Sequence, residues 1–289
     1  MFKGTGVALV TPFNPDFSID FDGFSRLLEH TAKGVDYYVV QGTTGESVTT
    51  SNEEKTQLLE FVKKNNPRNL PIVFGIGGNN TQIILSSIKQ TDFEGVSGLL
   101  SVSPYYSKPS QEGIVQHFIR IADTSPVPVI LYNVPGRTSS NLTAETTLRL
   151  ADHANIIGIK EASGDLNQCQ IISRNKPKEF LLISGDDLLT VPILSIGGVG
   201  VISVLANAYP EIFRQICRNF ETGNLVESRL ESFKLLEINP LMYAEGNPVG
   251  VKEVLKKMGV CGNEVRLPLV TASETLRERI YLAMKNIRA

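Results

Sequence analysis

A lysine near the end of an apolar run is the residue of this chain with the clearest capacity for chemistry. Residues 156–162 read IIGIKEA and place Lys160 close to the far end of the run. An apolar stretch of this length, bounded by polar residues, predicts a strand buried on both faces. A buried amine is held more readily as the free base, which is the form that attacks a carbonyl carbon. Taken alone, the stretch favours a lysine that reaches water or pairs with an acid, because that arrangement is the commoner one.

Other residues that could react or bind occupy equivalent places in the chain, because each follows a run that predicts a strand. In chain order they are Thr43, Thr44, Tyr105, Tyr106, Tyr132, Arg137 and Gly185. Singly, a threonine pair beside glycine is usually a turn, a lone tyrosine is usually core, and an arginine after proline and glycine is usually solvated. Their repetition at strand ends makes a shared site the better explanation.

These residue types suit chemistry on a keto acid. Lys160 can form a Schiff base with a ketone, and a tyrosine hydroxyl linked to a threonine hydroxyl can shuttle the protons that imine and enamine steps require. The backbone N–H groups and hydroxyls of residues 42–45 could hold one carboxylate, and the guanidinium of Arg137 could bind a second. Asp186 and Asp187, after the seventh predicted strand, would repel a phosphate and argue against a sugar phosphate.

The elements that must position these residues alternate between strand and helix. Predicted strands, each followed by helical periodicity, fall at residues 6–10, 37–40, 71–74, 98–102, 127–131, 156–162, 180–183 and 200–204. Alternation of this kind implies a parallel sheet, and eight such units imply an α/β fold, the closed (β/α)8 TIM barrel. A doubly wound open sheet is the alternative. No strand is followed by GxGxxG, so dinucleotide binding has little support.

The alternation stops after Gly223. We therefore expect residues 1–223 to form the barrel that carries the active site, and residues 224–289 to form a C-terminal helical region. Helical periodicity in this tail covers residues 225–236, 249–258 and 271–287. Function in barrels gathers at strand ends, so the helical appendage is expected to serve packing or oligomer contacts.

Composition argues against several other classes of protein. The chain has 289 residues, 42% of them hydrophobic, and a formal net charge of −2, which gives no electrostatic reason to expect nucleic acid or an anionic membrane as partner. The three cysteines form no CxxC pair, which favours a reduced, cytoplasmic setting. Neither a basic-then-apolar signal pattern nor an apolar run of membrane-spanning length is apparent.

A metal-dependent aldolase is the chemical rival of a Schiff-base enzyme. It would need clustered histidine and carboxylate ligands. The histidines are His30, His117 and His153, and all three fall in predicted helices without a shared motif. Because none follows a predicted strand, we expect no metal site and no cofactor.

Three segments of the chain resemble the motifs of a known family. They are GTTGE at residues 42–46, YNVPGRT at residues 132–138 and GIKEA at residues 158–162. They look like the motifs of the dihydrodipicolinate synthase family, a branch of the pyruvate-dependent class I aldolases. The likeness runs from residue 2 to about residue 207 and more loosely to the end. Arg137 followed by Thr138 favours the synthase branch over its relatives.

The resemblance implies a lyase that condenses pyruvate with L-aspartate 4-semialdehyde on the route to diaminopimelate and lysine. On this basis Lys160 would form the Schiff base with pyruvate. Tyr132 would relay protons with Thr43 and with Tyr106 of the partner subunit. Thr44 would hold the pyruvate carboxylate.

The same resemblance implies the remaining binding positions and an assembly. Arg137 would bind the carboxylate of the semialdehyde, and the backbone at Gly185 and Ile202 would line the site. The family is usually a homotetramer, often a dimer of tight dimers, so a homo-oligomer of this kind is expected.

Family members that lysine inhibits have a second site at the tight-dimer interface. Asn79 and Tyr105 match that site, whereas Ile83 replaces an acidic residue that would face the lysine amine. An apolar side chain cannot neutralise that charge. We therefore predict weak or absent feedback by lysine.

Two alternatives remain open from the sequence. An N-acetylneuraminate lyase or a 2-keto-3-deoxy acid aldolase would share the lysine but take a different second substrate. Arg137 discriminates them, because an aldehyde that bears a carboxylate needs it. A non-catalytic keto-acid-binding barrel is the other alternative, but binding needs only an anion site and not a nucleophile with a proton relay beside it.

Overall fold

Parallel strands in chain order make up the framework of the protein. The computed structural model describes residues 1–287. Within these residues the strands are β1 (Gly4–Ala8), β2 (Tyr37–Val40), β3 (Ile72–Gly75), β4 (Gly98–Val102), β5 (Val129–Asn133), β6 (Ile156–Glu161), β7 (Leu181–Ser184) and β8 (Gly200–Ser203). They follow one another in sequence order in a closed barrel, which confirms the predicted (β/α)8 fold.

Helices separate the strands and continue beyond the last one. The main helices are α1 (Phe21–Thr31), α2 (Asn52–Lys64), α3 (Thr81–Gln90), α4 (Gln111–Thr124), α6 (Ala144–Ala151), α7 (Leu166–Asn175), α8 (Thr190–Ser195), α9 (Pro210–Glu221), α10 (Leu225–Phe233), α11 (Val249–Met258) and α12 (Glu274–Ile287). Shorter turns of helix are η1 (Thr43–Gly45), α5 (Pro135–Thr138), η2 (Leu205–Asn207) and η3 (Asn239–Met242).

The fifth strand lies two residues later than the sequence pattern predicts. We expected residues 127–131, but β5 covers Val129–Asn133. The reason is Pro128, which has no N–H to donate to a neighbouring strand. Its carbonyl still accepts a hydrogen bond from Leu99 N at 2.8 Å, so ladder pairing begins directly after the proline. As a result, Tyr132 lies inside the strand and not in the loop that follows it.

The chain divides into two compact units. One comprises residues 1–3 and 71–202, and the other comprises residues 4–70 and residues 203 onward.

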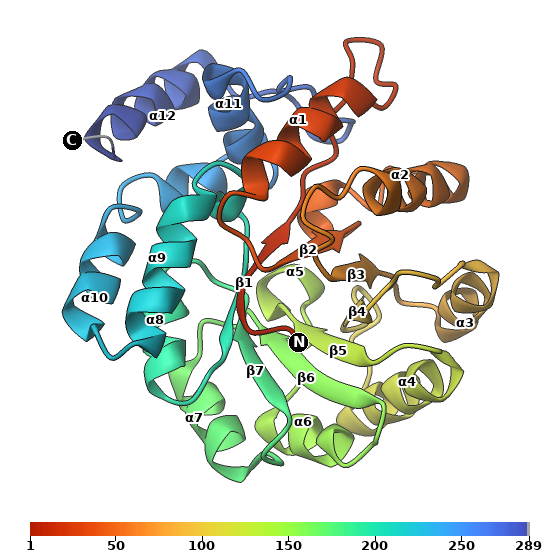
Figure 1. Ribbon diagram of the computed structural model, residues 1–289. Helices are drawn as coiled ribbons and strands as arrows, with labels where there is room; N and C mark the ends of the chain where they lie inside the picture. The colour runs from red at the N-terminus through yellow and green to blue at the C-terminus, as the bar shows by residue number, and fades with distance from the viewer. Residues whose placement is uncertain (288–289) are drawn as a thin grey trace. The chain divides into compact units, whose positions relative to one another are not determined.

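The unit of residues 71–202 holds the strand pairs from β3 to β8. Figure 1 shows α4, α6 and α7 on the outer side of the strands, where α4 contacts β5, α6 contacts β6 and α7 contacts β7. The three helices also contact one another in this order. A continuous core fills the space between strands and helices, and it includes Leu99, Phe118, Leu131, Ile159 and Leu182. These strands are buried on both faces, which explains why their sequences read as unbroken apolar runs.

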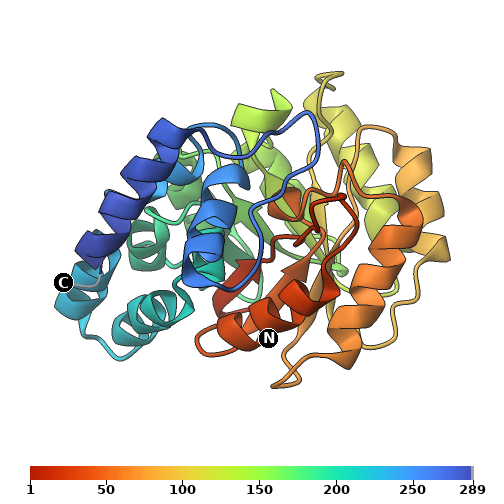
Figure 2. The same ribbon diagram turned by 90° about the horizontal axis from the view of Figure 1, so that it is seen from above.

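The unit that contains the C-terminal helices also contains β1 and β2. β1 pairs with β2 in parallel, from Gly6 opposite Tyr37 to Ala8 opposite Val39. α9 packs on α10, and α11 packs on α12 (Figures 1 and 2). The helices that follow the alternating part of the chain are therefore packed in one compact unit with its first two strands.

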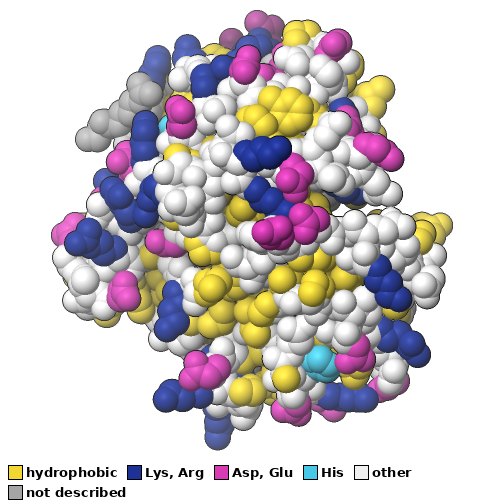
Figure 3. All heavy atoms as spheres, turned by 45° about the vertical axis from the view of Figure 1, so that its right-hand side comes forward, with side chains coloured by type: hydrophobic (Ala, Val, Ile, Leu, Met, Phe, Trp, Pro, Cys, Tyr) yellow, Lys and Arg dark blue, Asp and Glu magenta, His cyan; other side chains and the backbone are white. Residues whose placement is uncertain are grey.

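The surface matches the near-neutral composition. Figure 3 shows one face of the molecule, on which basic and acidic side chains are interspersed. Within residues 1–287, no helix is both long enough and apolar enough to span a membrane.

Candidate active site

Adjacent strands bring Lys160 and Tyr132 together. β5 and β6 pair in parallel with Tyr132 directly opposite Lys160. The Nζ atom of Lys160 lies 4.3 Å from the centre of the Tyr132 ring, and the two residues are only 5% and 6% exposed. Among residues 1–287, no hydrogen bond or ion pair reaches this Nζ. A buried amine beside a phenol, with no carboxylate partner, suits attack on a carbonyl.

A buried carboxylate clamps these two strands one residue further along. Glu161 is 1% exposed and lies opposite Asn133 in the strand register. Its oxygens accept hydrogen bonds from Asn133 Nδ2 at 3.0 and 3.1 Å, from Gln168 Nε2 at 2.8 Å and from Ser163 N at 2.7 Å. Successive strand residues face opposite sides, so this clamp lies behind Lys160. Sequence reasoning missed it, although both residues stand inside motifs that it singled out.

Gly185 lies against the stem of the candidate nucleophile. Its N–H donates a hydrogen bond to the Glu161 carbonyl at 2.7 Å. A Cβ at this position would lie 3.1 Å from Lys160 Cε and 2.6 Å from the Cβ of Ala162. Glycine is therefore required here for close approach to Lys160. Ile202, in β8 of the same unit, is fully buried.

Arg137 and Tyr106 belong to the same unit but are exposed. Arg137 lies in α5, directly after the strand of Tyr132. Tyr106 follows β4, is 88% exposed and has a φ of +72°. A left-handed conformation is uncommon for a bulky residue and marks a constrained position. The structure brings neither residue into a hydrogen bond, ion pair or ring contact with Lys160 among the described residues.

Thr43 and Thr44 belong to the other compact unit. They form η1 with Gly45, directly after β2. Thr44 is 2% exposed, and its Oγ1 accepts a hydrogen bond from Asn247 Nδ2 at 3.0 Å. Thr43 is partly buried, and its carbonyl accepts a hydrogen bond from Glu46 N at 3.1 Å. The threonine pair thus occupies a short, internally bonded turn, as GTTG predicts.

The end of this turn is held by an ion pair that sequence reasoning did not find. Lys252 Nζ donates to Glu46 Oε1 at 2.6 Å and to the Glu264 carbonyl at 2.6 Å. The two side chains of the pair are 0% and 2% exposed. Burial lowers the pKa of Lys252, and attraction to Glu46 opposes this shift. The available signal was a lysine inside the apolar run VGVKEV of residues 249–254.

His30 and His117 lie within hydrogen-bond distance of a backbone carbonyl and a threonine hydroxyl. His30 Nε2 lies 3.0 Å from the Ala208 carbonyl, and His117 Nδ1 lies 2.8 Å from Thr81 Oγ1. Burial lowers the pKa of His117 to about 4. We expected His153 in a helix, but it lies in the turn after α6, because α6 ends at Ala151. Among the described residues, no group of three or more His, Cys, Asp or Glu side chains could hold a metal ion.

The cysteines offer no competing nucleophile. Cys169, Cys217 and Cys261 are free. Burial raises the pKa of Cys169 and of Cys261 to about 12, and that of Cys217 to about 11. Since the thiolate is the reactive form of cysteine, these side chains are unreactive near neutral pH.

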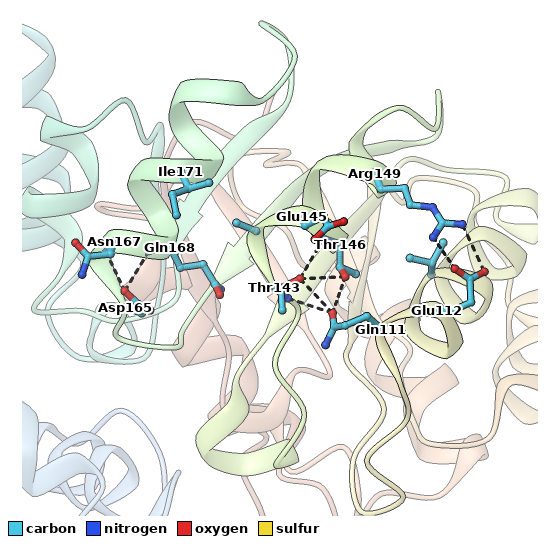
Figure 4. Close-up of a pocket in the computed structure, with 12 residues that line it drawn as sticks. Gln111, Glu112, Thr143, Glu145, Thr146, Arg149, Asp165, Asn167, Gln168 and Ile171 are labelled. Atoms are coloured by element: carbon cyan, nitrogen blue, oxygen red, sulfur yellow. Dashed lines mark hydrogen bonds and ion pairs between the residues drawn. The ribbon is translucent and has the colours of Figure 1, made fainter.

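A cavity of about 570 Å³ opens elsewhere in the unit of residues 71–202 (Figure 4). Its lining comes from α4, α6 and α7 and from the residues just before α6 and α7, and includes Gln111, Thr143, Thr146 and Asp165. These polar groups bond to one another, for example Thr146 Oγ1 to Gln111 Oε1 at 2.5 Å. None of the predicted site residues lines this cavity.

Comparisons with known proteins agree over the length of the chain. The sequence matches the Dihydrodipicolinate synthetase family over residues 1–287. It is 54% identical to the 4-hydroxy-tetrahydrodipicolinate synthase of Cytophaga hutchinsonii, with 98% of this chain and 95% of the relative covered. It is 49% identical to the protein of the same name from Flavobacterium psychrophilum, with 99% and 98% covered.

Solved structures show the same similarity. Dihydrodipicolinate synthase from Thermotoga maritima superposes with a TM-score of 0.96 at 38% identity, covering 100% of this chain and 99% of that one. The enzyme from Cyanidioschyzon merolae, solved with lysine bound, superposes with a TM-score of 0.95 at 36% identity, covering 99% and 98%.

Proposed function

We propose that Lys160 is the Schiff-base nucleophile of this chain, which belongs to the dihydrodipicolinate synthetase family. The protein is a lyase with 4-hydroxy-tetrahydrodipicolinate synthase activity, the activity named for relatives at 44–54% identity over nearly the whole chain. It condenses pyruvate with L-aspartate 4-semialdehyde in diaminopimelate and lysine biosynthesis. The contact of Lys160 with Tyr132 supports the assignment of the nucleophile, because it presents a buried amine without an acidic partner.

The proposed reaction begins at the ketone of pyruvate. Lys160 Nζ attacks the carbonyl carbon, and loss of water leaves an imine. Removal of a proton from the methyl carbon gives an enamine, whose carbon attacks the aldehyde of the second substrate. The amine of that substrate then attacks the imine carbon, closes the ring and releases Lys160. These steps form the carbon–carbon bond and return Lys160 as the free amine.

Tyr132 is the proposed proton carrier for these steps. Its ring lies 4.3 Å from Lys160 Nζ, which puts the phenol beside the reacting amine. Thr43 of the same subunit and the partner subunit's Tyr106 are proposed to complete the relay. The exposure of Tyr106 supports this role, because an 88% exposed ring is available to a second subunit. A homotetramer built as a dimer of tight dimers is proposed on the same basis.

Two further residues are proposed to hold the carboxylates of the substrates. Thr44 would donate its hydroxyl hydrogen to the pyruvate carboxylate, and Arg137 would form a paired hydrogen bond with the carboxylate of the semialdehyde. The exposure of Arg137 suits a residue that meets an incoming substrate. Gly185, whose backbone approaches the Lys160 stem, and Ile202 are proposed to line the site. We propose that no cofactor takes part and that the protein works in the cytoplasm.

Borohydride trapping with pyruvate tests the nucleophile directly. Reduction of the imine should leave a pyruvate-sized adduct that peptide mapping places on Lys160. The adduct should be missing from a folded Lys160→Ala variant. A folded wild-type protein that gives no adduct, or an adduct on another lysine, would contradict the proposed mechanism.

A further inference from the structure

Asn247, in the C-terminal region, contacts the hydroxyl of Thr44 in the threonine turn. Its Nδ2 donates to Thr44 Oγ1 at 3.0 Å across 203 positions of sequence. The two residues are 8% and 2% exposed. Among the described residues, Asn247 Oδ1 is buried and has no hydrogen-bond partner. A buried polar atom without a partner is costly, so a native structure that retains one needs a reason for it.

The turn that carries Thr44 is strained on both sides of the threonine pair. Gln41 has a φ of +62° and Glu46 a φ of +54°, which is left-handed backbone at residues other than glycine. Both side chains are anchored, since Thr50 Oγ1 donates to Gln41 Oε1 at 2.7 Å and Lys252 Nζ donates to Glu46 Oε1 at 2.6 Å. Strain of this kind persists where the surroundings impose it, and it clusters at functional sites.

We infer that Asn247 is a positioning residue that sets the hydrogen-bond direction of the Thr44 hydroxyl. The inference rests on the proposed role of Thr44 in holding the pyruvate carboxylate. A threonine hydroxyl has one hydrogen to donate and an oxygen that accepts. Because the amide of Asn247 donates to that oxygen, the hydroxyl hydrogen stays available for another acceptor. A carboxylate is a group that only accepts, so it is the matching ligand.

The unpartnered oxygen of Asn247 supports this orientation. If the amide were reversed, its oxygen would accept the Thr44 hydrogen and its NH2 group would lose the partner it now has. Buried N–H groups are left unpaired less often than carbonyl oxygens, so the observed orientation is the favoured one. Asn247 therefore holds Thr44 as a donor toward the substrate.

Steady-state kinetics in pyruvate test the inference. The Asn247→Ala variant should raise the KM for pyruvate roughly tenfold, the value expected for loss of a hydrogen bond that orders a contact with a charged group. The KM for the aldehyde and the kcat should change much less. The nearly isosteric Asn247→Asp variant should raise the KM for pyruvate further, because its carboxylate accepts the Thr44 hydrogen and repels pyruvate. This second variant also serves if Asn247→Ala does not fold.

A double-mutant cycle separates positioning from simple packing. In a Thr44→Val background there is no hydroxyl to orient, so Asn247→Ala should have less than about a twofold further effect on the KM for pyruvate. An equal effect of Asn247→Ala with and without the Thr44 hydroxyl would overturn the inference. The matched control is Asn239→Ala, since Asn239 in η3 is also 8% exposed with an unpartnered Oδ1. Its KM for pyruvate should match that of the wild type.

The same variants distinguish failure of the inference from failure of the proposed function. A Thr44→Val variant with unchanged KM for pyruvate would remove the role of Thr44 and the inference with it. A raised KM in Thr44→Val, with no change in Asn247→Ala, would overturn the role of Asn247 alone. The borohydride adduct on Lys160 reports the imine independently of both, and thermal unfolding shows that each variant is folded.

Discussion

Lys160 in β6 and Lys252 in α11 share their burial and their contact with an aromatic ring. They are 5% and 0% exposed, and each Nζ lies 4.3 Å from a ring centre, that of Tyr132 for Lys160 and that of Phe13 for Lys252. They differ in their polar partners. Lys252 donates to the Glu46 carboxylate and to a carbonyl, whereas no ion pair or hydrogen bond reaches Lys160 Nζ within residues 1–287.

This difference shows that burial alone does not make a lysine a nucleophile. A carboxylate and a carbonyl that accept hydrogen bonds from an ammonium group favour its charged form, which has no free electron pair to offer. Lys252 is therefore suited to hold the turn that ends at Glu46. Lys160, which faces the ring of Tyr132, is suited to attack a ketone. The type of partner, more than the degree of burial, separates Lys252 from Lys160, the proposed nucleophile.

Loss of the reactive amine gives the largest expected effect. A Lys160→Ala variant should lose at least about a thousandfold in kcat for the condensation, as is usual when a covalent nucleophile is removed. Initial rates of product formation measure the loss. A Lys252→Arg variant that folds should keep most of its activity, because its cation is not the nucleophile. Comparable loss of kcat in the two variants would break the distinction between the lysines.

Removal of the two lysine side-chain nitrogens should have different effects on stability. Lys252→Met leaves the Glu46 carboxylate buried without its partner, and the free energy of unfolding should fall by about 3–5 kcal/mol. Lys160→Met strands no charge, so its stability should equal or exceed that of the wild type. Urea unfolding of both variants measures the contrast. Adding Glu46→Gln to Lys252→Met should recover part of the loss; no recovery would mean that the ion pair is not the cause.

Substitution of Arg137 tests whether this cation binds the semialdehyde without taking part in the reaction with pyruvate. Arg137→Ala should lower kcat/KM for the semialdehyde by roughly tenfold to a hundredfold, since a charged hydrogen bond to its carboxylate is lost. The rate of pyruvate imine formation, followed by borohydride trapping, should stay the same. Arg149→Ala is the matched control, because Arg149 is an exposed arginine paired with Glu112. Equal losses with pyruvate and semialdehyde would count against the proposed role.

Free lysine as an inhibitor gives the smallest expected effect. The ammonium group of a bound lysine would be held best by a carboxylate, as Lys252 is by Glu46, but at the matching position the chain has Ile83, an apolar residue that is 64% exposed. Millimolar L-lysine should therefore lower the initial rate little or not at all. Sub-millimolar inhibition that disappears in a Tyr105→Ala variant would show that this prediction is wrong. Ile83→Glu should increase the sensitivity to lysine.

Much of the fold and part of the site could be predicted from local patterns. The period and length of the apolar runs were enough to predict eight strands, because strands buried on both faces must be apolar throughout. Two strands are shifted by two residues from their predicted positions. β1 covers Gly4–Ala8 where residues 6–10 were expected, and β5 begins later because Pro128 has no N–H for pairing. Lys160 and Tyr132 were both identified beforehand, and their pairing across β5 and β6 places them together in the structure. The clamp of Asn133 on Glu161 was missed, because buried polar partners are not visible in a hydrophobic pattern.

The sequence by itself determined the barrel and the lysine proposed as the nucleophile. Both depend on short-range features, namely alternating strands and helices and one charged residue at the end of an apolar run. Only the tertiary structure revealed which lysine lacks an acidic partner and what holds the threonine turn. The pairs Thr44–Asn247 and Glu46–Lys252 join residues 203 and 206 positions apart. Partners so distant in the chain become visible only in the folded structure, because no local periodicity of the sequence relates them.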